Sequence, residues 1–344
     1  MDSLSQIVLG AAVGELMLGK KLGNKGQFLG AIAGTIPDLD IFLNFLGHTE
    51  LEKLAIHRGY SHALFTHLFL ALPFAWATWR WFKDRFSFSW WYLFWLLGFV
   101  THVLLDCFTT YGTQLFLPFT NTLVGFNNIA VVDVFWTLPF MLLLAVCLFM
   151  KRDTVKRRKF AIASIAYATL YMGFTFFNKY YVHNKMAESL KAQQIQYDEL
   201  STTPNFFHNF LWSGVALTKD TIYFSEYSIL QNEPEILWSA VPRHLDLVDA
   251  HPAREQIEVI KWFSQGKYLA QQNGDTLRMF VAKWGRMDYR ETDPSKSIFF
   301  YFNIYRDGNG WRASQSRPDQ SKMDIKKALT AMYRRIWTSA LEEE

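Results

Sequence analysis

An apolar stretch in the N-terminal half of the chain ends in two ionisable side chains. The stretch is WWYLFWLLGFVTHVLLDCFTTYG, residues 90–112, and it contains His102 and Asp106. Residues four positions apart lie on one face of a helix, so this pair forms one local site. An ionisable group within lipid costs about 2.5–3.5 kcal/mol on insertion scales unless it meets a partner, a metal ion or water. Two interpretations stay open: a pair in which both bind a metal or Asp106 orients His102, and a buried neutral hydrogen-bonded pair.

Two carboxylates follow a proline in GTIPDLD, residues 34–40. Asp38 and Asp40 would point to different sides of a regular helix, so both can face one site only in a turn or at a helix end. They are candidate metal ligands, and Asp40 is also a candidate general base. The alternative is an ordinary Pro-Asp turn or cap.

The motif HRGYSH, residues 57–62, supplies two histidines and an arginine. Gly59 permits a bend, and Ser61 could cap a helix that begins near His62, so that His57 and His62 converge as ligands. Imidazole and carboxylate ligands suit zinc, iron or manganese. Arg58 could bind a phosphate or carboxylate through its forked donors. The alternative is a pair of histidines in a surface loop.

A further carboxylate, Asp133, stands in NNIAVVDVFW, residues 127–136, where another apolar segment begins. It could be a metal ligand, a general base, or a charge that complements the dipole at a helix N-terminus. His67 lies one turn deeper than the other candidates and is expected to be a packing residue. Glu15 is expected at the opposite end of its segment from the site.

Apolar segments must position these residues. Two short segments come first, 4–19 and 28–46, and either could be re-entrant; the small residues in GAAVG and GAIAG predict that they approach closely. Four segments are long enough to span a bilayer of about 30 Å: 63–82, 90–110, 130–150 and 160–182. We therefore predict an α-helical membrane bundle of about five or six hydrophobic helices over residues 1–182.

The Lys and Arg residues orient this bundle. They cluster in three connections: at Lys20, Lys21 and Lys25; at Arg80, Lys83 and Arg85; and in KRDTVKRRK, residues 151–159. Placing all three in the cytoplasm predicts six crossings, with the candidate site residues near the outer membrane face and the C-terminal region outside. The net charge of +4 is modest, and no basic tract is interleaved with aromatic residues, so nucleic acid is not an expected partner.

The composition changes after the last apolar segment. DTIYFSEYSI, PEILWSAV, TLRMFVAKWG and SIFFYFNIYRDGNGW are rich in strand-forming residues. AREQIEVIKWFSQGKYLAQQ and MDIKKALTAMYRRIW have helical spacing. Residues 183–344 are thus predicted to form a small soluble α+β domain outside the cytoplasm, large enough to bury its own core.

Four motifs together resemble the YdjM-type family of bacterial inner-membrane proteins. They are MDSLSQIVLGAAVGE, GAIAGTIPDLD, HRGYSH and THVLLDCFTTYGT followed by PF, and they cover about residues 1–140. The resemblance implies a multi-spanning membrane protein with a metal-dependent hydrolase assignment. The polar motif residues of the family correspond to Asp2, Asp38, Asp40, His57, Arg58, His62, His102 and Asp106. Many relatives have Thr-His where this chain has Ser5-Gln6, so a first-helix histidine is missing, although Gln6 could still form hydrogen bonds.

The leading functional hypothesis is a membrane-bound hydrolase that uses a divalent metal, zinc before manganese or iron. The metal ligands would come from Asp38, Asp40, His57, His62, His102 and Asp106, and the catalytic residues from Arg58, Asp40 and Asp133. A site at the lipid boundary favours an amphiphilic or lipid-linked ester or phosphoester as substrate. The alternative is a non-catalytic transporter or scaffold with a structural His/Asp cluster.

Overall fold

The computed structural model describes residues 1–83, 85–231, 235–287, 293–308, 310–317 and 325–338. The chain forms two compact units. The first contains Met1–His48, Ala55–Phe176 and Phe206–His208. The second contains Thr49–Leu54, Phe177–Asn205 and Asn209–Glu344.

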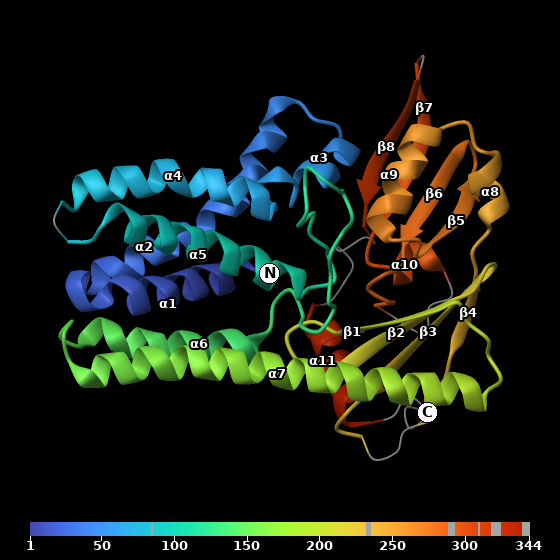
Figure 1. Cartoon of the computed structure of the whole chain (residues 1–344). Helices are drawn as coiled ribbons and strands as arrows, with labels where there is room; N and C mark the ends of the chain where they lie inside the picture. The colour runs from blue at the N-terminus through green and yellow to red at the C-terminus, as the bar shows by residue number, and fades with distance from the viewer. Residues whose placement is uncertain (84, 232–234, 288–292, 309, 318–324, 339–344) are drawn as a thin grey trace. The chain divides into compact units, whose positions relative to one another are not determined.

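The N-terminal half of the chain is helical (Figure 1). Its α-helices are α1 Ser3–Leu22, α2 Asn24–Thr35, α3 Glu50–Ile56, α4 Leu64–Trp81, α5 Phe88–Cys107, α6 Val134–Ala145 and α7 Val155–Ala192. Three 3-10 segments accompany them: η1 Ile36–Leu46, η2 Tyr60–His62 and η3 Val146–Phe149. Within the first unit α1 packs against α2, α5 and α6, and α5 also packs against α2 and α4. α1 and α5 therefore lie at the centre of this unit.

Glycines let α1 and α2 pack backbone to backbone, as the small-residue motifs predict. A Cβ atom at Gly10 would lie 2.2 Å from the carbonyl oxygen of Gly30. A Cβ atom at Gly14 would lie 2.1 Å from the carbonyl oxygen of Gly26. Neither position tolerates a side chain while the helices stay this close. The end of α2 also packs against α5, where Gly98 faces Ala33.

The apolar stretch predicted at 28–46 contains two different elements. α2 ends at Thr35, and the chain continues as the eleven-residue 3-10 helix η1, which has Pro37 in its first turn. Runs of 3-10 helix longer than three or four residues are uncommon and often mark a functional segment. Its apolar side chains are exposed in the structure, among them Phe42 and Phe45, and Phe45 is 84% exposed.

Among the described residues, two helices are long and apolar enough to cross a membrane, α5 and α7. The apolar segment Val134–Phe149 is shorter, because α6 gives way to 3-10 geometry at Val146. α4 is long enough, but His67 and Arg80 make it more polar. The five or six membrane helices expected from the sequence are therefore not confirmed.

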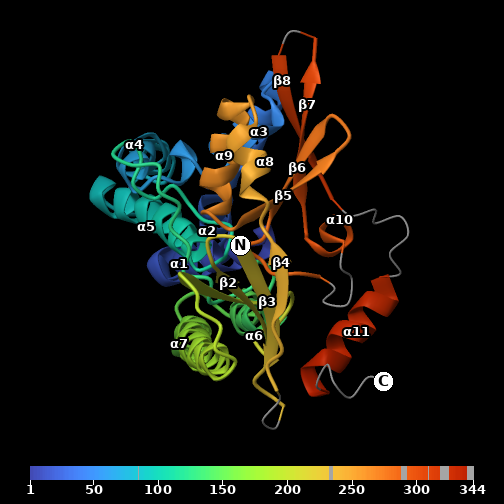
Figure 2. The ribbon, with the colours of Figure 1, turned by 90° about the vertical axis from the view of Figure 1, so that its right-hand side faces the viewer.

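The second unit contains two antiparallel sheets (Figures 1 and 2). The first has the strand order β1–β2–β3–β4, with β1 Glu199–Pro204, β2 Leu211–Leu217, β3 Thr221–Ser228 and β4 Ser239–Pro242. The second has the order β5–β6–β7–β8, with β5 Tyr268–Asn273, β6 Thr276–Val281, β7 Tyr301–Asp307 and β8 Gly310–Ser316. Side chains from both sheets share one apolar core, for example Phe224 and Phe280. This arrangement agrees with the predicted α+β class.

Besides most of α3 and the second part of α7, the second unit contains the helices α8 Leu245–Ala250, α9 Arg254–Ser264, α10 Pro294–Ser297 and α11 Ile325–Trp337. One helical prediction was too long: AREQIEVIKWFSQGKYLAQQ forms α9 and then β5. Gln265 and Gly266 have positive φ angles of 53° and 78°, which end the helix. β7 and β8 pair as neighbouring antiparallel strands, and the last pair of their register is Asp307 with Gly310. Three predicted segments reach residues outside the described part of the chain, at 234, 309 and 323–324.

Candidate metal centre

Four side chains from three separate segments converge in the first unit. His102 and Asp106 lie one turn apart near the end of α5, Asp38 comes from η1, and His62 ends η2. One potential ligand atom of each lies within 4.8 Å of all the others. The Nε2 atom of His62 is 3.4 Å from Asp38 Oδ1 and 3.2 Å from Asp106 Oδ2. The Nε2 atom of His102 is 3.4 Å from Asp38 Oδ1 and 3.7 Å from Asp106 Oδ2.

The hydrogen bonds on the far side of each ring decide what these nitrogens present to the centre. His102 Nδ1 donates to the carbonyl oxygen of Gly34 at 2.7 Å, because a carbonyl can only accept. His62 Nδ1 lies 2.9 Å from the hydroxyl of Ser61, which itself donates to Asp40. When neutral, both rings therefore carry their proton on Nδ1 and present the Nε2 lone pair to the centre.

Four acceptor atoms thus face one another without a donor among them. The two Nε2 atoms are 3.3 Å apart, and Asp106 Oδ2 is buried without a hydrogen-bond partner. A single proton on one ring would satisfy one contact and leave the others unpaired. A tetrahedral metal shell with bonds of about 2.0–2.2 Å has edges of roughly 3.3–3.6 Å. The five separations given above, 3.2–3.7 Å, are close to that size, so these four residues fit a divalent metal ion.

The second oxygen of Asp106 is held by groups that only donate. Arg58 Nη2 lies 3.1 Å from Asp106 Oδ1, and Gln6 Nε2 donates to the same oxygen at 3.1 Å. The α-amino group of Met1 also donates to it. Gln6 therefore does form the hydrogen bond expected of it in place of the family histidine. These contacts fix the carboxylate with Oδ2 turned toward the two histidines.

Asp40 lies one layer outside the four. Its Oδ2 accepts hydrogen bonds from the hydroxyl of Ser61 at 2.7 Å and from the backbone N–H of Arg58 at 3.0 Å. Its Oδ1 lies 3.2 Å from His57 Nδ1. Asp40 therefore orients His62 through Ser61, the usual task of a carboxylate behind a metal-binding histidine.

His57 and Arg58 also lie outside the four. The ring of His57 is 31% exposed and contacts Asp40, Tyr111 and the edge of the His62 ring, and His57 is not one of the four converging residues. Arg58 has a positive φ of 58°, which turns the chain between the two histidines of the motif and sends only His62 inward. Its guanidinium is buried over the ring of Tyr111 and donates to Thr109 at 3.2 Å.

The structure does not bring Asp133 into this group. Its carboxylate accepts from the backbone N–H of Trp136 at 3.0 Å and from the hydroxyl of Tyr171 at 3.0 Å. The first contact caps α6, which is the helix-terminus interpretation of this residue. Asp2 likewise caps α1 by accepting from the backbone N–H of Ser5. Each of these two carboxylates thus caps the helix that follows it.

Sequence reasoning missed the roles of two residues, Ser61 and Gly34. Ser61 was expected to cap the next helix, but α4 has Ala63 as its N-cap and no side-chain cap. Its hydroxyl joins Asp40 to His62 instead. The position of Ser61 inside the HRGYSH motif, next to His62, could have indicated this role. Gly34 accepts the hydrogen bond from His102 through its backbone carbonyl oxygen, and the type of a residue does not predict such a backbone contact. His67 is a packing residue as expected, and its Nε2 contacts the carbonyl of Ser61 at 2.8 Å.

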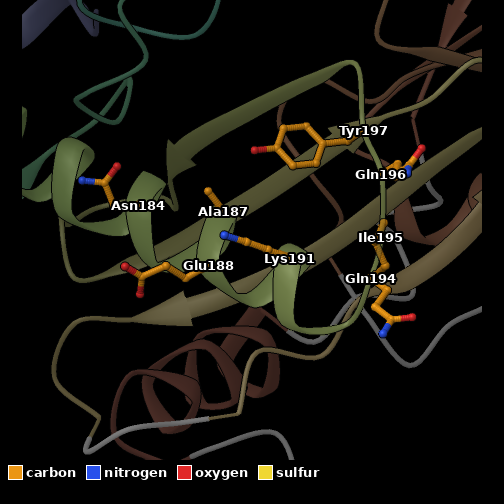
Figure 3. A pocket seen from close by; sticks show the side chains of 8 residues that line it. All are labelled: Asn184, Ala187, Glu188, Lys191, Gln194, Ile195, Gln196 and Tyr197. Atoms are coloured by element: carbon orange, nitrogen blue, oxygen red, sulfur yellow. The ribbon is translucent and has the colours of Figure 1, made fainter.

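The cluster is accessible from one side. Asp38 is 23% exposed at its side chain, whereas His62, His102 and Asp106 are fully buried there. Asp38 belongs to η1, a helix that also carries exposed apolar side chains. A shallow hollow in the second unit has different chemistry: Figure 3 shows Glu188, Lys191 and Tyr197 at its edge, without a histidine or a second carboxylate.

Comparison with known proteins adds one match. The family described as YdjM inner membrane protein matches residues 1–182, which include every residue of the cluster. No curated protein and no solved structure matches the chain.

Proposed function

Because the chain belongs to the YdjM inner membrane protein family, we propose that it is a membrane-bound hydrolase whose His/Asp cluster holds a divalent metal ion. The observation that carries this proposal is the convergence of four acceptor atoms, from Asp38, His62, His102 and Asp106, with no donor among them. Two imidazoles and two carboxylates are ligands that zinc accepts readily, and manganese and iron are the alternatives.

A bound metal of this kind polarises a scissile carbonyl or phosphoryl group and lowers the pKa of a bound water toward neutrality. The protein's own groups prepare the site for that chemistry. Arg58 keeps a positive charge 3.1 Å from Asp106, which favours negative charge developing next to the cluster. Asp40 and Ser61 hold the ring of His62 in one orientation and one tautomer. Asp133 has no part in this proposal, because its carboxylate caps α6.

The surroundings of Asp38 support an amphiphilic substrate. Asp38 is part of η1, and the exposed apolar side chains of that helix include Leu39, Phe42 and Phe45. An acyl or prenyl chain could lie along these side chains while its ester or phosphoester reaches Asp38. A small water-soluble substrate would have no need of such apolar side chains.

The test is a hydrolysis assay on the purified full chain in detergent, stripped of metal and reloaded with zinc or manganese. The panel contains p-nitrophenyl esters and phosphodiesters with short and long alkyl chains. We expect metal-dependent hydrolysis that favours long chains and is abolished in His102→Ala. Stoichiometric metal without hydrolysis of any member of the panel would contradict a hydrolase.

That negative result would favour the competing function, a scaffold or transporter with a structural metal. One observation speaks for it: four protein ligands can complete a tetrahedral shell, as structural zinc sites do. A proton relay is less well supported. Glu15, the ionisable residue at the other end of α1, is bound by Arg157 through two contacts of 2.6 Å.

The membrane orientation is also part of the proposal. The Lys and Arg distribution favours several crossings, with the second unit outside the cytoplasm. Fusion of alkaline phosphatase, which is active only outside the cytoplasm, to the C-terminus should give an active reporter, whereas fusion within residues 151–159 should not. The opposite pattern would reverse the orientation.

A further inference from the structure

Three connections of the first unit meet at the end of α1, and each carries basic residues. Lys21 Nζ donates to the carbonyl oxygen of Arg85 at 2.6 Å, which joins the α1–α2 and α4–α5 connections. Arg152 Nη1 donates to the carbonyl oxygen of Lys21 at 3.1 Å, which adds the α6–α7 connection. The three basic clusters seen in the sequence therefore lie at one end of the unit. We call Lys20, Lys21, Lys25, Arg85 and Arg152 the basic end.

The cations of the basic end lack anionic partners within the described residues. All five side chains are exposed, and none forms an ion pair with a described Asp or Glu. The nearby carboxylate of Glu15 is buried and engaged by Arg157. Five like charges gathered at one end of the unit repel one another, so an external anion stabilises this surface.

Apolar side chains continue the surface beside these charges. Phe149, at the end of η3, is 89% exposed, and Trp90, in the first turn of α5, is also exposed. The ammonium of Lys21 lies 4.6 Å from the ring centroid of Phe86. Aromatic side chains next to Lys and Arg are typical of the level at which lipid headgroups meet acyl chains.

We propose that the basic end binds the headgroups of anionic phospholipids. The phosphates would lie against Lys20, Lys25 and Arg85, and the acyl chains along the neighbouring apolar side chains. A soluble acidic protein would match the charges but not Phe149 and Trp90. The proposal is independent of the metal cluster and of any hydrolase activity.

The test compares lipid retention by native mass spectrometry of the full chain in a neutral detergent. Equal amounts of phosphatidylglycerol and phosphatidylcholine are added to the wild type and to the variant Lys20→Gln/Lys25→Gln/Arg85→Gln. The side chains of Lys21 and Arg152 are left intact because they hold the three connections together. Removal of one surface charge weakens lipid attraction about five-fold, so we expect roughly 100-fold weaker retention of phosphatidylglycerol in the variant.

The matched control is Lys185→Gln/Lys191→Gln/Lys219→Gln, which removes the same charge from the second unit. It should retain phosphatidylglycerol as the wild type does, and all three proteins should melt at the same temperature. Equal retention of the two lipids by the wild type, or equal losses in both variants, would overturn the proposal. Displacement of phosphatidylglycerol by inorganic phosphate at the same concentration would also overturn it, because the site would then be one for free anions.

Discussion

The Nε2 atoms of His62 and His102 lie 3.3 Å apart, and the Nδ1 atom of each ring is engaged on the opposite side. Two nitrogen lone pairs at that distance repel each other unless a cation lies between them. Asp38 and Asp106 add two carboxylate oxygens to the same space. Because the four ligands share one ion, we expect that the loss of a single ligand, or of a residue that orients a ligand, will change the affinity for the metal.

Asp106→Asn should abolish metal binding and also destabilise the fold. The substitution removes the charge that faces the histidines and the charge that pairs with the buried guanidinium of Arg58 at 3.1 Å. An unpaired buried charge costs about 3–5 kcal/mol. We expect metal content near background and a lower melting temperature. The matched control is Asp133→Asn, which should keep its metal and nearly all its stability, since Asn caps a helix about as well as Asp. Loss of metal in both variants would point to general unfolding.

Asp40→Asn and Ser61→Ala should weaken metal binding without changing the number of ions at saturation. Ser61→Ala breaks the chain of hydrogen bonds that runs from Asp40 through Ser61 to His62 Nδ1, and Asp40→Asn removes the negative charge at its end. Loss of such an orienting partner typically costs 10–100-fold in metal affinity. Competition titration with a chelating dye measures it, and Ser61→Thr should restore the affinity. If Asp40→Asn instead lowered the saturating metal content, Asp40 would be a direct ligand.

Gly30→Ala should destabilise the first unit. A Cβ atom there would lie 2.1 Å from the carbonyl oxygen of Gly10, so α1 and α2 must separate. Separation shifts the end of α2, including the Gly34 carbonyl that accepts from His102. We expect a lower melting temperature and weaker metal binding together. Gly173→Ala in α7 is the control: nothing lies within 4 Å of its Cβ position, so the change should be neutral or stabilise the helix by up to about 1 kcal/mol. Equal effects at both positions would refute the close packing.

Glu15 and Arg157 should show strong energetic coupling. The guanidinium donates to both carboxylate oxygens at 2.6 Å, and Gln27 donates to one of them at 2.9 Å. Both side chains are almost fully buried, so Glu15→Gln or Arg157→Met alone should cost about 3–5 kcal/mol. The double variant should cost less than the sum, because no buried charge is left without a partner. Additive losses in denaturant unfolding would contradict the pairing.

Parts of this arrangement follow from local rules. The spacing of His102 and Asp106 placed both on one helical face, and the glycines of the first two segments predicted their close approach. The backbone conformation of Arg58 could not be predicted from the sequence. Its positive φ angle directs His57 and His62 to different places, and residues other than glycine rarely adopt that conformation.

The 3-10 geometry of η1 explains the other differences. At three residues per turn, Asp38 and Asp40 point about 120° apart, so one reaches the centre and the other the layer behind it. The apolar composition of that stretch predicted burial or lipid contact and could not distinguish the two kinds of helix. Asp133 was a candidate metal ligand because it has a carboxylate, but its hydrogen bond to the backbone of Trp136 is that of a helix N-cap.

The most direct test is the metal content of the purified full chain, measured by inductively coupled plasma mass spectrometry after reloading and removal of loosely bound ions. About one divalent ion per chain is expected in the wild type and in His67→Ala, which removes a buried histidine outside the cluster. His62→Ala and His102→Ala should be close to background. A wild type without metal, or unchanged content in both cluster variants, would contradict the metal centre.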